Sequence, residues 1–336
     1  MKIKQILLAS RPKGLPTSAN FKFVDTELPA PQAGEVLVKP VYFSVDPYMR
    51  GRMNEGKSYI PPFEVGMPIT SGCVAEVSSS QDERFQAGDM VMLATSRPLM
   101  PWATAIVYPA EQLRKVDSSI PLTYYLGLLG MPGLTAYFGL MDIGKPKAGE
   151  TVVISGAAGA VGIVVGQIAK LQGCRVVGIA GGADKVKMLT DQFGFDAAID
   201  YKNNKDMKAA VAAACPNGVD IYFDNVGGEI SDAVMLNLNF HARVPLCGQI
   251  ALYNATELPN GPRPQPLLVT RSILMQGFVI GNYASRFEEG FKALFAWVKA
   301  GKLKYTETVE EGFDHLPEAL LGLFSGRNSG KMIVKV

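Results

Sequence analysis

Histidine and cysteine are scarce in this sequence, and their scarcity bears first on metal chemistry. The only histidines among 336 residues are His241 and His315. The four cysteines are far apart and form no C-x-x-C pair: Cys73, Cys174, Cys215 and Cys247. A structural zinc site needs clustered thiolates, and a catalytic one needs ligands at recognisable spacings. We therefore expect a metal-free protein with reduced cysteines, with His315 in a loop and His241 ahead of a strand.

Long apolar runs and a strong net charge are also missing. No run reaches the roughly 20 apolar residues of a membrane helix, and no early stretch has the order of a signal peptide. A net charge of +2 gives no reason to expect a nucleic acid or an acidic membrane surface as a partner. Since 48% of the residues are apolar and only 19% are charged, the chain can bury a sizeable core. We expect a soluble, cytoplasmic protein, long enough for two domains.

A glycine-rich turn between two apolar runs organises the chain. Residues 151–155 are mostly apolar and β-branched, residues 156–162 are small, and an amphipathic stretch leads to a second apolar run at 175–180. This order predicts strand, turn, helix and parallel strand. The glycines leave room for a pyrophosphate, and a helix that begins near Ala160 would offer it free N–H groups. The motif predicts a dinucleotide site, with a plain structural turn as the alternative; its residues are Gly159, Ala160, Val161 and Gly162.

The end of the second strand bears on the choice of cofactor. NAD enzymes usually place a carboxylate there to hold the ribose 2′-hydroxyl. Here the strand ends in Ala180, Gly181 and Gly182, which leave room for a 2′-phosphate, and Lys185 could pair with that phosphate. Asp184 lies close to the usual position of the carboxylate, but it could equally cap the next helix. We therefore favour NADPH as the cofactor.

The sequence changes in character near residue 121. Residues 1–120 alternate short apolar runs with proline and glycine, which predicts an antiparallel, β-rich domain. In residues 121–299 a long helical stretch, with a break expected at 131–133, precedes alternating strand and helix candidates. That alternation predicts an α/β fold with a doubly wound parallel sheet. Residues from about 300 to 336 end in a β-like segment and are expected to complete the first domain.

Candidate site residues follow the strands, at the edge where a doubly wound sheet binds its ligand. Asn225 comes after one apolar strand, and Cys247, Gly248 and Tyr253 come after the next. The phenol of Tyr253 can donate a hydrogen bond to a carbonyl oxygen that gains negative charge during a reaction. The alternatives are a polar turn for Asn225 and a buried aromatic for Tyr253.

Other candidates are less specific. The backbone of Phe278, Val279 and Ile280 follows a further strand and could meet a nicotinamide amide. Asn328 is either a turn residue or a phosphate or ribose contact. Tyr48 is either part of a wall of the substrate cleft or a residue of a structural turn. Tyr59, on a loop with prolines nearby, could close over a cofactor or equally be a rim contact. For the arginines beside Tyr48 we favour a structural ion pair with Asp46.

Five motifs together resemble the zinc-independent medium-chain dehydrogenase/reductases, in the branch of curcumin, prostaglandin and alkenal double-bond reductases. They are residues 45–50, 130–137, 157–162, 224–228 and 253–254. The run 253–259 is most similar to bacterial curcumin reductases. The resemblance covers essentially the whole chain. It implies a GroES-like first domain, a Rossmann domain, a cleft between them and usually a homodimer.

The same resemblance implies an activity and roles for residues. The activity is NADPH-dependent reduction of the C=C bond of α,β-unsaturated ketones and aldehydes, by hydride transfer to the β-carbon. Carried over by position, Gly159 to Gly162 would hold the pyrophosphate, and Lys185 with Tyr201 the 2′-phosphate. The other cofactor contacts would be Asn225, Cys247 to Tyr253, Phe278 to Ile280 and Asn328. Tyr253 and Tyr59 would lie near the enone oxygen, and the substrate contacts would be Tyr48, Tyr59 and Met131.

Rival interpretations remain open from the sequence. One is an NADPH:quinone reductase, and another is an NADPH-binding protein without catalytic activity. An alcohol dehydrogenase is disfavoured because the metal ligands are missing.

Overall fold

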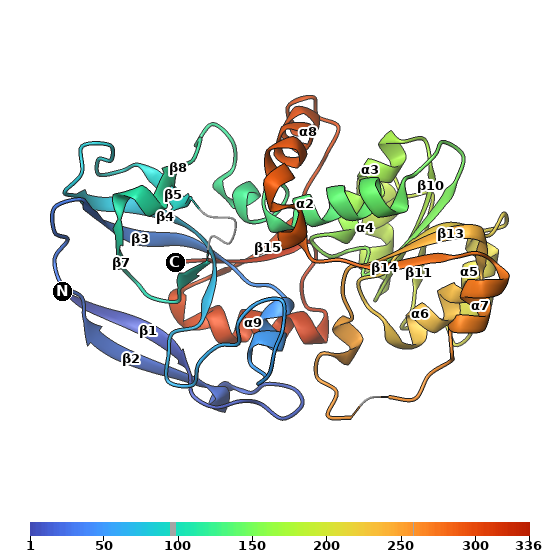
Figure 1. The fold of residues 1–336 in the computed structure, drawn as a ribbon, viewed down its shortest axis with the longest axis horizontal. Helices are drawn as coiled ribbons and strands as arrows, with labels where there is room; N and C mark the ends of the chain where they lie inside the picture. The colour runs from blue at the N-terminus through green and yellow to red at the C-terminus, as the bar shows by residue number, and fades with distance from the viewer. Residues whose placement is uncertain (95–98, 258) are drawn as a thin grey trace. The chain divides into compact units, whose positions relative to one another are not determined.

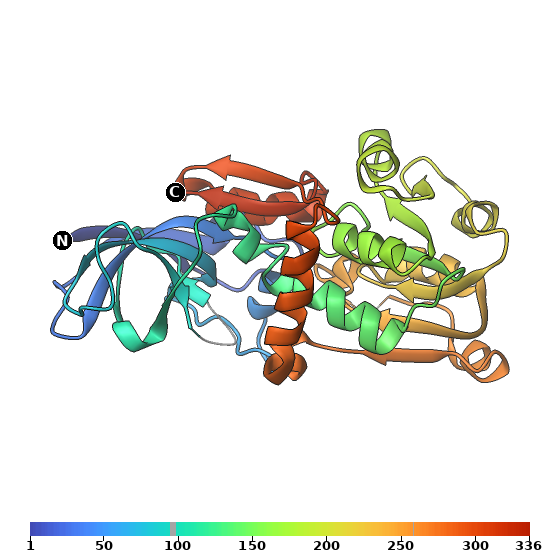
Figure 2. The same ribbon diagram turned by 90° about the horizontal axis from the view of Figure 1, so that it is seen from above.

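The computed structural model describes residues 1–94, 99–257 and 259–336. The chain divides into two compact units, which Figures 1 and 2 draw from two directions. The β-rich unit comprises residues 1–127 and 308–336, and the α/β unit comprises residues 128–307. Leu258, in the run that is similar to bacterial curcumin reductases, lies outside the described residues.

The α/β unit is built on a six-stranded sheet in the order β11-β10-β9-β12-β13-β14. Each described pair of neighbouring strands is parallel. Because the chain begins at the centre, runs to one edge and returns to the other side, the sheet is doubly wound, which confirms the predicted fold class. The strands are β9 (Thr151–Ser155), β10 (Arg175–Ala180), β11 (Ala197–Asp200), β12 (Val219–Phe223), β13 (Leu238–Leu246) and β14 (Leu274–Gly277).

Helices cover both faces of this sheet (Figure 1). The crossover helices are α3 (Gly162–Leu171), α4 (Ala183–Phe193), α5 (Met207–Ala214) and α6 (Gly228–Met235). On one face Val177 packs in a buried cluster with Val211 of α5 and Val234 of α6. The next residue, Gly178, faces the other side, where an added Cβ would lie 2.8 Å from Leu189 of α4. The alternation of side chains along each buried strand therefore supplies both layers.

The stretch before the sheet differs from the sequence prediction. We expected a long helix broken at residues 131–133, but α2 (Met131–Phe138) begins there, with Pro132 in its first turn. Proline is tolerated at that position because the first N–H groups of a helix need no intrahelical partner. The other helical segments of this unit are η4 (Gly139–Gly144), η5 (Ile250–Leu252), α7 (Gln265–Thr270), η6 (Ile280–Arg286) and α8 (Phe287–Lys299).

The β-rich unit contains an eight-stranded sheet and a two-stranded ribbon. The sheet follows the order β15-β16-β3-β4-β5-β8, with β6 on β4 and β7 on β3, and its described pairings are antiparallel. The strands are β1 (Lys2–Leu8), β2 (Phe21–Glu27), β3 (Glu35–Ser44), β4 (Thr70–Ser80), β5 (Met90–Leu93), β6 (Leu99–Pro101), β7 (Ile106–Pro109), β8 (Leu113–Lys115), β15 (Glu307–Glu311) and β16 (Lys331–Lys335). β1 and β2 form the ribbon.

The helices of this unit are short apart from one. The list is η1 (Ser18–Asn20), α1 (Tyr48–Arg52), η2 (Ala110–Gln112), η3 (Leu122–Leu126), η7 (Phe313–His315) and α9 (Leu316–Ser325). α9 packs its apolar face, including Leu316 and Leu320, into the same core as Ile6 and Trp102. None of the helices in the described ranges is both long and apolar enough to cross a bilayer.

Both histidines occupy positions other than those expected. His315 ends η7 and directly precedes α9, so it lies at a helix start and not in a loop. His241 lies inside β13 with a positive φ of 60° and donates its N–H to the carbonyl of Arg271 at 2.8 Å. This irregularity in β13 accompanies a shift in its pairing with β12.

A buried lysine anchors β16 in the β-rich sheet. Lys331 is 1% exposed, and its Nζ donates to the carbonyls of Val45 and Met332 at 2.8 Å each. The same ammonium pairs with the Asp46 carboxylate at 3.2 Å. A buried charge is tolerated where a counter-charge and hydrogen bonds satisfy it, as here. Asp46 therefore pairs with a lysine from the far end of the sequence, where we had expected a neighbouring arginine.

Candidate functional site

The glycine-rich turn and Asn225 lie side by side at the carboxyl ends of β9 and β12. Gly156 has a φ of +59°, and an added Cβ would lie 3.4 Å from the Cβ of Asn225. The Asn225 side-chain amide donates to the carbonyl of Ser155 at 2.8 Å. Since β9 and β12 are the neighbouring strands from which the chain winds in opposite directions, this is the switch point at which doubly wound sheets bind ligands.

The turn presents a helix start suited to an anion. α3 begins at Gly162, two residues later than predicted, so Ala160 and Val161 lie in the turn. Within the described α/β unit, the N–H groups of Val161 and Gly162 donate to no acceptor. An added Cβ on Gly162 would lie 2.5 Å from the Gly156 oxygen, so this glycine is required by the packing of the turn itself. The free amides and the helix dipole together fit a pyrophosphate.

A second corner of the site lies beyond β10. An added Cβ on Gly181 would lie 2.9 Å from the ring of Tyr201, so the aromatic ring covers this strand end closely. Lys185 is half-buried in the first turn of α4, and burial, followed by the positive charge of Lys202, lowers its pKa. The two lysines therefore lie near enough to repel each other. A doubly charged phosphate fits such a place.

Two carboxylates lie near this corner, Asp184 and Asp200, and Asp184 does not have the capping role that we considered from the sequence. Asp184 does not cap α4, because Gly182 occupies the N-cap position, without a side-chain cap among the described residues. The Gly182 N–H donates instead to the carboxylate of Asp200 at 2.8 Å, and this hydrogen bond is the main cause that lowers the pKa of Asp200. Sequence reasoning missed Lys202, although it directly follows Tyr201.

Tyr253 lies beyond β13 with its hydroxyl close to Gly248. An added Cβ on Gly248 would lie 3.1 Å from that hydroxyl oxygen. The oxygen accepts a hydrogen bond from the Gln249 N–H at 3.4 Å, so the phenolic proton remains available to another acceptor. Burial raises the pKa of Tyr253, opposed in part by the Gln249 bond. At neutral pH the residue is therefore a hydrogen-bond donor.

The segment after β14 reaches the same edge of the sheet. Phe278 donates its N–H to the carbonyl of Leu246 at 3.4 Å, which places it beside the end of β13. Its ring lies edge-on to Phe223, with centroids 6.2 Å apart, and an added Cβ on Gly139 would lie 2.4 Å from that ring. The side chain packs inward, so the backbone through Val279 and Ile280 is the part of this segment suited to a ligand.

The remaining predicted residues belong partly to the β-rich unit. Tyr48 begins α1, and burial, followed by the charge of Asp46, raises its pKa, with a further contribution from Tyr59. Tyr48 and Tyr59 are therefore neighbours, and Tyr59 is 53% exposed. Asn328 lies in the turn before β16 and donates to the carbonyl of Gly330 at 2.7 Å. Met131, in the α/β unit, is 38% exposed at the start of α2.

The arginines near Tyr48 have structural roles. Arg50 donates to the carbonyl of Gly14 at 2.8 Å and to the side chain of Asn54 at 2.6 Å. Arg52 donates to the carbonyl of Pro61 at 2.9 Å, near the end of the loop that carries Tyr59. These contacts hold the turn, which agrees with the structural role favoured from sequence, although the ion pair described above joins Asp46 to Lys331.

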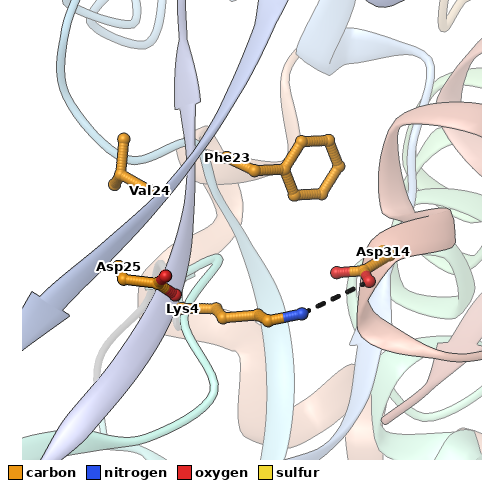
Figure 3. A pocket seen from close by; sticks show the side chains of 5 residues that line it. All are labelled: Lys4, Phe23, Val24, Asp25 and Asp314. Carbon is orange, nitrogen blue, oxygen red and sulfur yellow. Dashed lines mark ion pairs between the residues drawn. The ribbon is translucent and has the colours of Figure 1, made fainter.

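A surface pocket of about 330 Å³ lies elsewhere in the β-rich unit (Figure 3). It is lined by Lys4, Phe23, Val24, Asp25 and Asp314. An exposed ion pair spans it, with 3.6 Å between the Lys4 Nζ and the Asp314 carboxylate. None of the predicted site residues lines this pocket.

The structure contains no assembled metal centre in residues 1–94, 99–257 and 259–336. No three side chains of His, Cys, Asp or Glu within these ranges come together in a way that could hold an ion. All four cysteines are free thiols. Burial raises the pKa of Cys247 to about 12. Thiolate is the form that ligates metals and attacks electrophiles, so these thiols are poor candidates for either role.

Comparisons with known proteins identify the family of the chain. Residues 4–116 match the family model described as the N-terminal domain of oxidoreductase, and residues 160–299 match the one described as zinc-binding dehydrogenase. The chain is 53% identical to a putative NADP-dependent oxidoreductase, YfmJ, of Bacillus subtilis (strain 168), over 99% of this chain and 97% of that protein. It is 44% identical to the NADPH-dependent curcumin reductase of Escherichia coli (strain K12), over 98% and 96%.

A solved structure extends the comparison to three dimensions. The crystal structure of CurA from Vibrio vulnificus in complex with NADPH has 44% sequence identity and a TM-score of 0.92, with 99% of each chain covered. These matches extend over the whole length, and the motifs of the sequence predicted the same group. The chain belongs to the medium-chain dehydrogenase/reductase family, together with the curcumin reductases.

Proposed function

We propose that this protein is an NADPH-dependent oxidoreductase that reduces the C=C bond of α,β-unsaturated ketones and aldehydes without a metal ion. The whole-length identity of 44% to a curcumin reductase supports the cofactor and the substrate class. The observation that carries the chemistry is Tyr253, whose hydroxyl has its own proton available at the ligand-binding edge of the sheet.

The residues of the α/β unit suit the parts of NADPH. The free amides of Val161 and Gly162 would hold the pyrophosphate. Lys185, with Lys202 and Tyr201 beside it, would hold the 2′-phosphate that distinguishes NADPH from NADH. The nicotinamide half would be met by residues after the other strands: Asn225, Cys247, Gly248 and the backbone of Phe278, Val279 and Ile280.

The chain's own part in the reaction is electrostatic. NADPH, when bound, supplies the hydride that adds to the β-carbon of the substrate. Tyr253 donates a hydrogen bond to the substrate carbonyl oxygen, where negative charge develops as the enolate forms. Its raised pKa keeps the phenol protonated, so it stabilises this charge as a donor. Solvent or Tyr253 gives the proton to the α-carbon, and Tyr59 is a further candidate hydroxyl that the family resemblance carries over by position.

The test combines a substrate panel with one variant. Initial rates are measured with enones, quinones and saturated ketones, with NADPH and NADH, and with and without a chelator. We expect turnover of enones with NADPH that ignores the chelator. Tyr253→Phe should lower that turnover by about 10²- to 10³-fold, the usual effect of losing one oxyanion donor. The matched control is Tyr42→Phe on β3, which should retain the wild-type rate.

Each rival has its own outcome in this assay. Turnover of quinones alone would establish the quinone reductase. Tight NADPH binding without any turnover would establish the non-catalytic protein. Reduction of saturated ketones that a chelator abolishes would contradict the metal-free mechanism. Full activity of Tyr253→Phe would refute the role of the phenol.

We also propose that the protein is a homodimer that pairs through β14. This strand ends the six-stranded sheet, so one side of its backbone is unpaired within the sheet. Large apolar side chains are exposed around it: Leu274 of β14 at 46%, Phe240 of β13 at 71% and Val269 of α7 at 78%. An edge of this kind suits a symmetric pairing with a second copy.

A further inference from the structure

The carboxylate of Asp224 is buried at the switch point of the sheet. Asp224 directly follows β12 and is 1% exposed. Five donors meet its two oxygens: Ser155 Oγ at 2.8 Å, Tyr222 OH at 2.9 Å, Val226 N at 3.0 Å and Gly227 N at 2.9 Å on Oδ1, and Ser231 Oγ at 2.8 Å on Oδ2. None of these donors is a cation. The burial of this carboxyl group is therefore compensated by directed hydrogen bonds.

The main chain of Asp224 continues the same network toward β13. Its N–H donates to the carbonyl of Pro245 at 3.0 Å. Its carbonyl oxygen accepts from the N–H of Cys247 at 2.8 Å and of Gly248 at 3.1 Å. One residue thus holds the segment after β13, which carries predicted cofactor contacts.

Ser155 passes the network on to Asn225. Its hydroxyl donates to Asp224 and accepts from the Asn225 N–H at 2.9 Å. The Asn225 side chain is held in turn by the Ser155 carbonyl at 2.8 Å. The orientation of Asn225 therefore depends on a serine hydroxyl, and the orientation of that hydroxyl depends on the buried carboxylate.

We propose that Asp224 is a positioning residue for the nicotinamide half of the cofactor site, acting through Ser155 on Asn225 and through its own carbonyl on Cys247 and Gly248. The inference rests on the proposed function. Its hydrogen-bond partners lie on β9, β12, β13 and α6, and in the segments that directly follow β12 and β13. The residues suited to the 2′-phosphate lie beyond β10 and β11, outside this network. Loosening the network should disturb one half of the site and spare the other.

Two mild variants test the proposal. Asp224→Asn keeps an acceptor for the donors on Oδ1 and gives Ser231 an amide that its hydroxyl can accept from. Ser155→Ala removes the hydroxyl that links Asp224 to Asn225, and with it the acceptor of the Asn225 N–H. The matched control is Asp220→Asn on the same strand, because Asp220 bonds the Thr151 N–H at 2.8 Å at the opposite end of the sheet.

The readout is binding by calorimetry of two probes, NADPH and 2′,5′-ADP. The second probe carries the 2′-phosphate but no nicotinamide half. We expect Asp224→Asn and Ser155→Ala each to weaken NADPH binding on the order of tenfold, the effect of losing one or two hydrogen bonds. The affinity for 2′,5′-ADP should stay within about twofold of wild type, since this probe makes none of the hydrogen bonds that the variants disturb. Asp220→Asn should leave both affinities unchanged.

The outcomes separate this inference from the proposed function. Wild-type protein that fails to bind NADPH refutes the proposed function. Wild-type protein that binds NADPH, with both variants losing affinity equally for the two probes, overturns the inference and makes Asp224 a general structural residue. Variants that bind both probes like wild type also overturn it.

Discussion

Replacing Lys185 by alanine should remove most of the preference for NADPH over NADH. Lys185 is half-buried in the first turn of α4, and burial and the charge of Lys202 lower its pKa. A hydrogen bond to a charged group contributes about 1.5–3 kcal/mol, which corresponds to roughly a 10- to 150-fold change in affinity. Because Lys202 would still face the phosphate, we expect the lower end, a rise of about 10- to 30-fold in KM for NADPH. NADH lacks the phosphate, so its KM should change by less than about twofold.

The measurement is a set of steady-state rates with each cofactor at fixed ionic strength. The control is Lys187→Ala, which removes the same charge from an exposed position on the same helix. Any general loss of positive potential will appear in both variants, and screening by salt will reduce it. An equal loss for NADH and NADPH, or an equal loss in the Lys187 control, would refute the assigned contact.

The same lysine predicts a pH dependence. Since its pKa is lowered, Lys185 loses its proton at a lower pH than an ordinary lysine. The affinity for NADPH should therefore fall as the pH rises through that pKa, and binding of NADH should not follow. The Lys185→Ala variant should lack this fall, and a wild-type curve identical for both cofactors would contradict the contact.

Three further predictions concern packing, thiols and assembly. Gly162→Ala should lower the free energy of unfolding by about 1–3 kcal/mol in urea titrations, because the added Cβ meets backbone atoms at 2.5 and 2.6 Å. The control is Gly51→Ala, whose added Cβ has nothing within 4 Å and should change the free energy of unfolding little. An equal loss of stability in both variants would refute the argument. Leu274→Lys should convert a dimer to a monomer in light scattering, and an unchanged mass would exclude this edge as the interface. Burial raises the pKa of Cys174 and Cys215 to about 11 and that of Cys247 to about 12, so at pH 8 roughly one thiol in a thousand or fewer is a thiolate. Iodoacetamide at pH 8 should therefore label the native protein very slowly. Rapid labelling, followed by mass spectrometry, would contradict the burial of these thiols.

The parts of the fold that depend on local pattern could be predicted. The unit from β9 to β10 followed from two apolar runs and the small residues between them, since a buried parallel strand is apolar on both faces. β2 was missed because Lys22 and Asp25, both exposed, lie on opposite faces of the strand and interrupt the apolar pattern on each. α9 was missed because Pro317 suggested a loop, although proline is favoured in the first turn of a helix.

The candidate site divides in the same way. Positions at strand ends, such as Asn225 and Tyr253, could be predicted as candidates because topology alone brings such ends to one edge. The buried hydrogen-bond network of Asp224 could not be predicted, because one of its donors, Ser155, is 69 residues away and the sequence around Asp224 is typical of a polar turn. The ion pair of Lys331 with Asp46 could not be predicted for the same reason, since only the folded sheet brings the two residues together.

The position of β16 has a consequence for the order of folding during synthesis. Lys331 bonds to Val45 across 286 residues, and β16 lies between β15 and β3 in the sheet. The α/β unit is one continuous segment, so it can close while the ribosome is still translating. β3 is synthesised well before β16, so until β16 is made one edge of β3 is unpaired and Asp46 lacks its counter-ion, Lys331. The β-rich unit thus begins to form before the α/β unit and is completed after it, and during that interval the open edge of β3 can pair with another chain.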